Sequence, residues 1–273
     1  MSSTERTVSL SFERCTTARF GTRVVAPPRV HPDPSAAEHA VRAARRALED
    51  RARQEYVGVL LMRHVHGLLV DVNAPMDVQE AALAFALEEQ RHTAMCVDAA
   101  RSLGSDGVLA FALPELQRRR RGALHEELLD QIVGLFVVSE TVALDLLVFS
   151  LRSLPRSTYR DVLRAIARDE VGHARFGPAL LGEIRASGAP WLPYPGDAAV
   201  AELARDHVAR MRARDVVHED ERAMFADPAL GAALRALGVP VANDFVRAYH
   251  RSLDVSVPAA LARAGVVVEG AGG

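Results

Sequence analysis

The sequence predicts an all-α protein built around a four-helix bundle with one long crossover. Four long stretches carry apolar or small residues at helical spacing. Short breaks at residues 71–75 and at Pro155 separate the first stretch from the second and the third from the fourth, whereas a longer connection joins the second to the third. A tight hairpin, a long crossover and another tight hairpin make up the connectivity of such a bundle.

An extended arm is expected before the bundle. Residues 1–34 alternate polar and apolar side chains and end in a proline-rich stretch, which favours an extended chain with one short strand. The sequence from Ser35 to Glu38 then forms a capping box, which predicts the start of the first helix. This helix is expected to continue to about residue 70.

The same periodicity predicts the remaining helices. Asp77 can cap the second helix, which reaches about residue 103 and is followed by a mixed or irregular connection. The third helix covers about residues 123–153, and the fourth opens at Pro155 and reaches about residue 186. A charged helix over about residues 197–225 and shorter helical pieces follow. The chain is therefore divided into an extended arm (1–34), the bundle (35–187) and a C-terminal helical extension that packs on the bundle (188–273).

The composition excludes several classes of function. With 33 basic and 35 acidic residues, the chain has a net charge of −2 and no global attraction for nucleic acid or for an anionic membrane. The sequence contains no Lys, which excludes Schiff-base chemistry and a lysine-containing phosphate loop. Two cysteines cannot form a disulfide framework, and no uninterrupted apolar run reaches the length of a membrane span. We therefore expect a cytoplasmic protein with no nucleic-acid or membrane partner.

Acidic side chains lie on the apolar faces of the predicted helices. Glu55 falls on the apolar stripe of the first helix, and Glu140 falls on that of the third. Because a buried ion costs several kcal/mol even after the protein relaxes, acids at such positions need a counter-charge or a proton.

The second and fourth helices each carry the pattern Glu-x-x-His. The pairs are Glu89 with His92 and Glu170 with His173. Residues three apart share one face of a helix, so each pair presents a carboxylate and an imidazole together. Apolar residues flank both pairs, which predicts that they too point inward.

The four acids are expected at one height in the bundle. Glu55 lies 18 residues before Asn73 in the first turn, and Glu89 lies 16 residues after it. Glu140 and Glu170 each lie 15 residues from the second turn. At the helical rise per residue, the mismatch within either hairpin is roughly 3 Å or less. Four carboxylates and two imidazoles at one level form a six-ligand set for two divalent cations of the iron or manganese kind.

This pattern resembles the ferritin-like diiron-carboxylate superfamily, whose bundles carry Glu, Glu-x-x-His, Glu and Glu-x-x-His on successive helices. The similarity covers about residues 36–186. It implies that the metal ligands, which are also the catalytic residues, are Glu55, Glu89, His92, Glu140, Glu170 and His173. In several members the residue before each ligand Glu forms a hydrogen bond with the His ligand of the opposite helix, and those positions here are Glu88 and Asp169.

Neighbouring positions separate this chain from some members of the superfamily. Cys96 stands where the radical-forming subunit of class I ribonucleotide reductase has a Tyr, and bacterial multicomponent monooxygenases resemble this chain in having Cys there. Leu144 replaces the Thr of those monooxygenases, and Ile166 replaces an extra His of the arylamine N-oxygenases. The other acid–His neighbours, Asp206-His207 and His218-Glu219, lie on a charged helix where no apolar stripe directs them inward.

The resemblance implies an O2-activating oxidoreductase with two iron ions, or one manganese and one iron. It would hydroxylate, N-oxygenate or desaturate a small organic substrate, with O2 as co-substrate and electrons from an external donor, and a homodimer would fit the superfamily. Two alternatives stay open. One is a ferroxidase or iron-handling protein without an organic substrate, and the other is a non-catalytic helical interaction protein.

Overall fold

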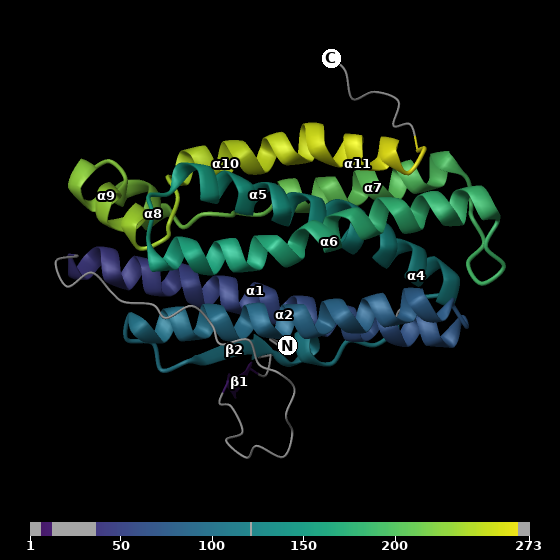
Figure 1. The fold of residues 1–273 in the computed structure, drawn as a ribbon, viewed down its shortest axis with the longest axis horizontal. Coiled ribbons are helices and arrows are strands. Elements are labelled where there is room, and N and C mark those ends of the chain that lie inside the picture. Colours follow the sequence, from purple (N-terminus) through teal and green to yellow (C-terminus); the bar gives the residue numbers. More distant parts are fainter. Residues whose placement is uncertain (1–6, 13–36, 121, 267–273) are drawn as a thin grey trace, which may run out of the picture.

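A computed structural model describes residues 7–12, 37–120 and 122–266, and these residues are mainly helical, as the sequence predicts (Figure 1). The helices are α1 (Glu38–Asp71), α2 (Met76–Ser102), α3 (Leu113–Leu116), α4 (Leu124–Gln131), α5 (Glu140–Ser153), α6 (Thr158–Ser187), α7 (Asp197–Arg212), α8 (Glu219–Met224), α9 (Pro228–Ala236), α10 (Ala242–Arg251) and α11 (Val257–Arg263). The described residues also form the π-helical segments η2 (Ile132–Ser139) and η3 (Ser252–Ser256) and the strands β1 (Thr7–Ser11) and β2 (Val108–Ala112).

Helices α1 and α2 form a hairpin with a tight turn, close to the predicted boundaries. Asn73 has a φ of 53° in this turn, a left-handed conformation that Asn tolerates better than most residues. The predicted cap was wrong by two residues, because α2 begins at Met76 after Pro75 and Asp77 lies inside the first turn. A proline just before a helix needs no hydrogen-bond acceptor for its nitrogen, so it suits this position.

The predicted third helix consists of α4, η2 and α5, which form one continuous helical stretch, Leu124–Ser153. The stretch is long and apolar enough to cross a membrane by length and composition. However, 61% of its most apolar window is buried inside the protein, as in a core helix. The π-helical segment in the middle has no counterpart in the sequence-based prediction.

Helix α6 begins three residues later than Pro155, the predicted start. Its cap is Ser157, whose hydroxyl oxygen accepts a hydrogen bond from the backbone N–H of Arg160 at 3.2 Å. The helix ends at Gly188, whose φ of 59° is the left-handed conformation that closes many helices.

Strands β1 and β2 pair antiparallel, with Thr7 opposite Ala112. The short strand expected in the N-terminal arm is thus confirmed for β1, whereas residues 1–6 and 13–34 of that arm and the capping residue Ser35 lie outside the described residues. The long crossover was expected to be mixed or irregular, and it contains β2 and α3. Leu109 and Phe111 of β2 are buried against the helices.

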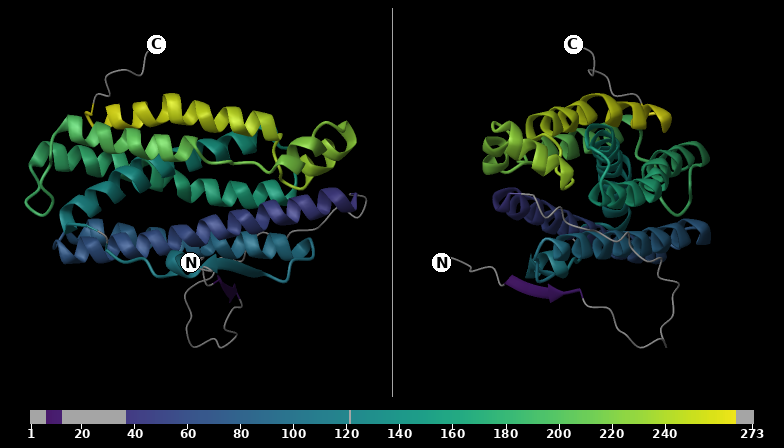
Figure 2. Two further views of the ribbon diagram at one scale, coloured as in Figure 1. Left: turned by 180° about the vertical axis from the view of Figure 1, so that it is seen from behind. Right: turned by 60° about the vertical axis from the view of Figure 1, so that its left-hand side comes forward.

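The helices form two main layers. One layer is the α1–α2 pair, with the small sheet on its outer side, and the other contains α5 and α6, with α7, α10 and α11 on the far side (Figures 1 and 2). The charged helix predicted to reach about residue 225 ends at Arg212, and α8 is separate.

The buried core divides into two apolar clusters along the long helices. On α1, Ala52 belongs to one cluster and Met62 belongs to the other. Glu55 lies between them in sequence and is itself buried. The interruption of the core therefore coincides with the level at which the acidic residues were predicted to meet.

Candidate metal centre

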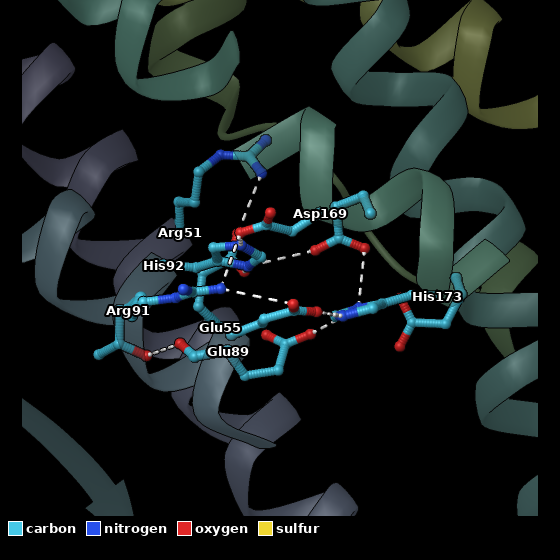
Figure 3. Close-up of polar contacts among 11 residues, drawn as sticks. Arg51, Glu55, Glu89, Arg91, His92, Asp169 and His173 are labelled. Atoms are coloured by element: carbon cyan, nitrogen blue, oxygen red, sulfur yellow. Dashed lines mark hydrogen bonds and ion pairs between the residues drawn. The ribbon is translucent and has the colours of Figure 1, made fainter. Parts of the chain in front are cut away.

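All six predicted ligands are buried and lie close together, and Figure 3 labels four of them, Glu55, Glu89, His92 and His173. They come from four elements, with one or two residues from each. The residues are Glu55 of α1, Glu89 and His92 of α2, Glu140 of α5, and Glu170 and His173 of α6. Both imidazoles are 0% exposed, and none of the four glutamates is more than 8% exposed.

The six side chains form two groups of four. One group is Glu55, Glu89, His92 and Glu170, and the other is Glu89, Glu140, Glu170 and His173. Within each group one ligand atom from every residue lies within 4.8 Å of the others. Glu89 and Glu170 belong to both groups, whereas Glu55 and Glu140 belong to one group each.

The two imidazoles point the same nitrogen toward the centre. Nδ1 of His92 lies 3.4 Å from carboxylate oxygens of both Glu55 and Glu170, and Nδ1 of His173 lies 3.3 Å from Oε2 of Glu170. These contacts do not meet the geometry of a hydrogen bond, and both Nδ1 atoms and Glu170 Oε2 are buried without a hydrogen-bond partner. Buried polar atoms without partners are rare in proteins, and here they converge on one point.

The opposite nitrogen of each imidazole is held by a carboxylate on the facing helix. His92 Nε2 lies 3.1 Å from Asp169 Oδ2, and His173 Nε2 lies 2.8 Å from Glu88 Oε2. The contacts predicted for Glu88 and Asp169 are therefore present in the structure. A carboxylate that accepts from Nε2–H leaves the Nδ1 lone pair free for a cation, which is the usual arrangement around histidine ligands.

Two arginines that the sequence analysis did not assign extend this network. Arg91 lies 3.4 Å from Glu88 and 3.3 Å from Asp169, so a single guanidinium links the two outer carboxylates. Arg51 lies 3.5 Å from Oε1 of Glu55. The contacts of Arg51 with Glu55 and of Arg91 with Glu88 follow from helical spacing, which could have indicated them, whereas the contact of Arg91 with Asp169 depends on the packing of α2 against α6 (Figure 3).

Burial and repulsion between neighbouring carboxylates raise the pKa values of two of the glutamates. Burial raises the pKa of Glu89 well above its usual range, and the neighbouring carboxylates of Glu55, Glu140 and Glu170 raise it further. Burial also raises the pKa of Glu140 to about 7, although the nearby imidazole of His173 acts in the opposite direction. In the absence of cations, the cluster therefore retains protons that carboxylates in water would release.

The two histidines carry the positive charge that balances the ionised carboxylates. Burial lowers the pKa of His92, but the hydrogen bond with Asp169 and the close carboxylates of Glu170 and Glu55 raise it to about 11. The pKa of His173 is also raised, against the effect of burial, by the close carboxylates of Glu140, Glu170 and Glu89. For Glu170, contacts with the two histidines outweigh burial and lower the pKa. Without metal, charge balance in this site depends on protonated imidazoles.

A glycine on α1 makes room for one of the shared carboxylates. A Cβ atom at Gly58 would lie 2.6 Å from Oε2 of Glu89, which is closer than real Cβ contacts allow. The structure shows that Gly58 lets Glu89 approach α1.

Aromatic rings border the cluster on the side of His173. The ring of Phe85 lies 4.3 Å from the imidazole of His173, and Phe136 and Phe176 pack around Phe85. On the other side, Cys96 is fully buried, and burial raises the pKa of its thiol. Apolar walls of this kind exclude water and strengthen every charge interaction inside.

The remaining His–acid candidates pair elsewhere. His207 Nε2 lies 2.8 Å from Asp130 Oδ1, and His218 Nε2 lies 2.8 Å from Asp50 Oδ2, so neither joins the two ligand groups. A cavity of about 500 Å³ lies at the α1–α2 turn beside Trp191, and no ligand candidate lines it.

The donor set fits two divalent cations, because carboxylates and inward-facing imidazole nitrogens suit iron or manganese. Comparisons of the chain with protein-family models, with curated proteins and with solved structures found no match.

Proposed function

We propose that this chain is a dinuclear metal oxidoreductase that activates O2 on the scaffold of a ferritin-like four-helix bundle. The observation that carries the proposal is the sharing of Glu89 and Glu170 by two four-residue groups, each with an inward-facing imidazole nitrogen. A bundle that supplies one carboxylate from each of two helices and Glu-x-x-His from each of the other two is a known framework for such centres. We propose two iron ions, or one manganese and one iron.

The charges around the cluster support two divalent cations in particular. Four ionised glutamates carry −4, which two divalent cations balance when both imidazoles are neutral. The outer carboxylates of Glu88 and Asp169 add −2. Arg91, which contacts both of them, and Arg51, which contacts Glu55, add +2. With both imidazoles neutral, one cation would leave −2 in a buried site, which protons on the ligands would have to balance.

The protein residues then have distinct tasks. Glu88 and Asp169 fix the orientation and tautomer of the histidines, and the Phe85 cluster keeps water away from His173. The bound iron would supply electrons to O2 and the oxidising power that follows. Without a metal, burial raises the pKa of Glu140 to about 7, so this carboxyl holds a proton near neutral pH until a cation displaces it.

We propose that the oxidised molecule is a small organic substrate, which is hydroxylated, N-oxygenated or desaturated with electrons from an external donor in the cytoplasm. The test is to load the protein anaerobically with ferrous iron and mix it with O2. Consumption of O2 with a transient absorbing species is expected in the wild type and not in Glu170→Ala. If the iron-loaded wild type gives neither signal, the proposal is wrong.

Ferroxidase activity is the second candidate, and the outer carboxylates favour it. The side chains of Glu88 and Asp169 are 26% and 31% exposed, so partly solvated carboxylates border the buried histidines. Rapid oxidation of excess ferrous iron, with many ions retained per chain, would favour this activity over substrate oxidation.

A metal-independent helical interaction protein would instead show the same thermal stability with and without a chelator.

A further inference from the structure

The ligand Glu140 directly follows the π-helical segment η2, whereas Glu55 lies inside an uninterrupted α-helix. A π-helix closes its hydrogen bonds over five residues rather than four, so it turns the following residue to a different direction around the helix axis. The hydroxyl of Ser139 donates a hydrogen bond of 2.9 Å to the carbonyl oxygen of Gly134 within this segment. The direction of the Glu140 side chain therefore depends on the geometry of η2.

A histidine from the C-terminal extension packs directly against the backbone of η2 at Gly134, which has no side chain. A Cβ atom at Gly134 would overlap the imidazole ring of His207 of α7. The ring is also fixed by its 2.8 Å contact with Asp130, four residues before Gly134, and this contact holds the pKa of Asp130 below its usual range. His207 is thus anchored to the same helical stretch on which it packs.

A second contact holds the end of η2. Met211 of α7 places its sulfur 4.0 Å from the hydroxyl of Ser139, the residue before Glu140. The carbonyl oxygen of Met211 accepts a 2.7 Å hydrogen bond from the buried Tyr249 of α10. Helix α7 therefore contacts η2 at both Gly134 and Ser139, and α10 packs against α7 through Tyr249.

We propose that His207 is a positioning residue that acts through Gly134 and η2 on Glu140. Its effect falls on the group that contains Glu140 and His173, and not on the group that contains Glu55 and His92. This inference rests on the proposed metal site, and it assigns to the C-terminal extension a role in that site.

The test compares His207→Ala with His218→Ala, which removes the other His–Asp pair of the same 2.8 Å length. Binding of Mn²⁺ alone is followed by the electron paramagnetic resonance signal of the free ion. We expect two Mn²⁺ per chain in the wild type and in His218→Ala. In His207→Ala we expect one ion with unchanged affinity and a second bound about tenfold more weakly. Loss of a residue that orients a metal ligand has an effect of this size. Equal weakening of both ions, or no weakening, would overturn the inference.

A second pair of variants separates positioning from general destabilisation. Gly134→Ala in the wild type should weaken the second ion, because the new methyl group competes with the His207 ring. In the His207→Ala background the ring is absent, so Gly134→Ala should cause little further loss of affinity for the second ion. Additive losses would contradict the proposed route through Gly134.

Hydrogen exchange of the metal-free proteins separates a failure of this inference from a failure of the proposed function. Amide exchange in η2 should be faster in His207→Ala than in the wild type and unchanged in His218→Ala. If the wild type binds no Mn²⁺, the metal proposal fails and exchange alone decides whether His207 holds the segment before Glu140. Unchanged exchange in η2 would overturn the role of His207 in either case.

Discussion

His173 Nε2 lies 2.8 Å from Oε2 of Glu88, a residue of the facing helix α2. His92 Nε2 has the equivalent contact with Asp169 of α6, at 3.1 Å. Each Glu-x-x-His motif thus carries, just before its glutamate, the acid that orients the histidine of the other motif. The two helices depend on each other for the orientation of both imidazoles.

Removal of one outer carboxylate should affect one ion more than the other. Glu88→Ala leaves His173 without its partner and should weaken the ion held with Glu140 by about 10- to 100-fold, whereas Asp169→Ala should weaken the ion held with Glu55. Binding isotherms with Mn²⁺ measure both steps. Glu80→Ala, an exposed acid on the same helix, is the control, and equal losses in all three variants would refute the pairing.

The shared glutamates should matter more for metal stoichiometry than the terminal ones. Because Glu89 and Glu170 belong to both groups, alanine at either position should abolish binding of both ions. Alanine at Glu55 or Glu140 should leave one ion bound. Metal analysis after gel filtration distinguishes these results, and retention of one tightly bound ion by Glu89→Ala would show that this carboxylate is not shared.

The close approach of Glu89 to α1 gives a sharp steric test. Gly58→Ala should displace the Glu89 carboxylate and reduce metal binding, because the new Cβ would lie 2.6 Å from Oε2. Gly67→Ala on the same helix is the matched control, since no atom lies within 4 Å of its Cβ position. This control should raise the free energy of unfolding by up to about 1 kcal/mol through helix propensity and leave metal binding unchanged.

Metal binding should release protons and strengthen with rising pH. Metal-free His92 has a pKa of about 11, so at neutral pH a cation at Nδ1 must displace a proton, and His173 behaves in the same way. Below about pH 7 the protonated Glu140 adds to the release, so the rise of affinity with pH is steeper there. Calorimetric titrations in buffers of different ionisation enthalpy count the protons. Binding without proton release would contradict the charge distribution described above.

The site was largely predictable from the sequence because its main features are periodic. Helical spacing put Glu55 and Glu140 on apolar faces, and equal distances from the two turns placed the acids at one level, as the structure confirms. Local spacing cannot reveal contacts that depend on how helices cross. Arg91 between two carboxylates, Gly58 against Glu89 and His207 against Gly134 are of this kind.

Element boundaries and irregular segments were harder to predict for a related reason. A π-helix differs from an α-helix by the insertion of a residue within a continuous apolar run, which leaves little trace in the periodicity of residues 132–139. Strand β2 forms because β1, far away in the sequence, pairs with it. The early end of α7 at Arg212 likewise lies within a charged stretch whose pattern suits a helix throughout.

Anomalous X-ray diffraction from crystals of the iron-loaded protein would locate the ions. Two peaks are predicted per chain, one enclosed by Glu55, Glu89, His92 and Glu170 and the other by Glu89, Glu140, Glu170 and His173. A single peak would leave the shared carboxylates without their proposed role. The absence of any peak among these residues at full iron loading would contradict the dinuclear centre.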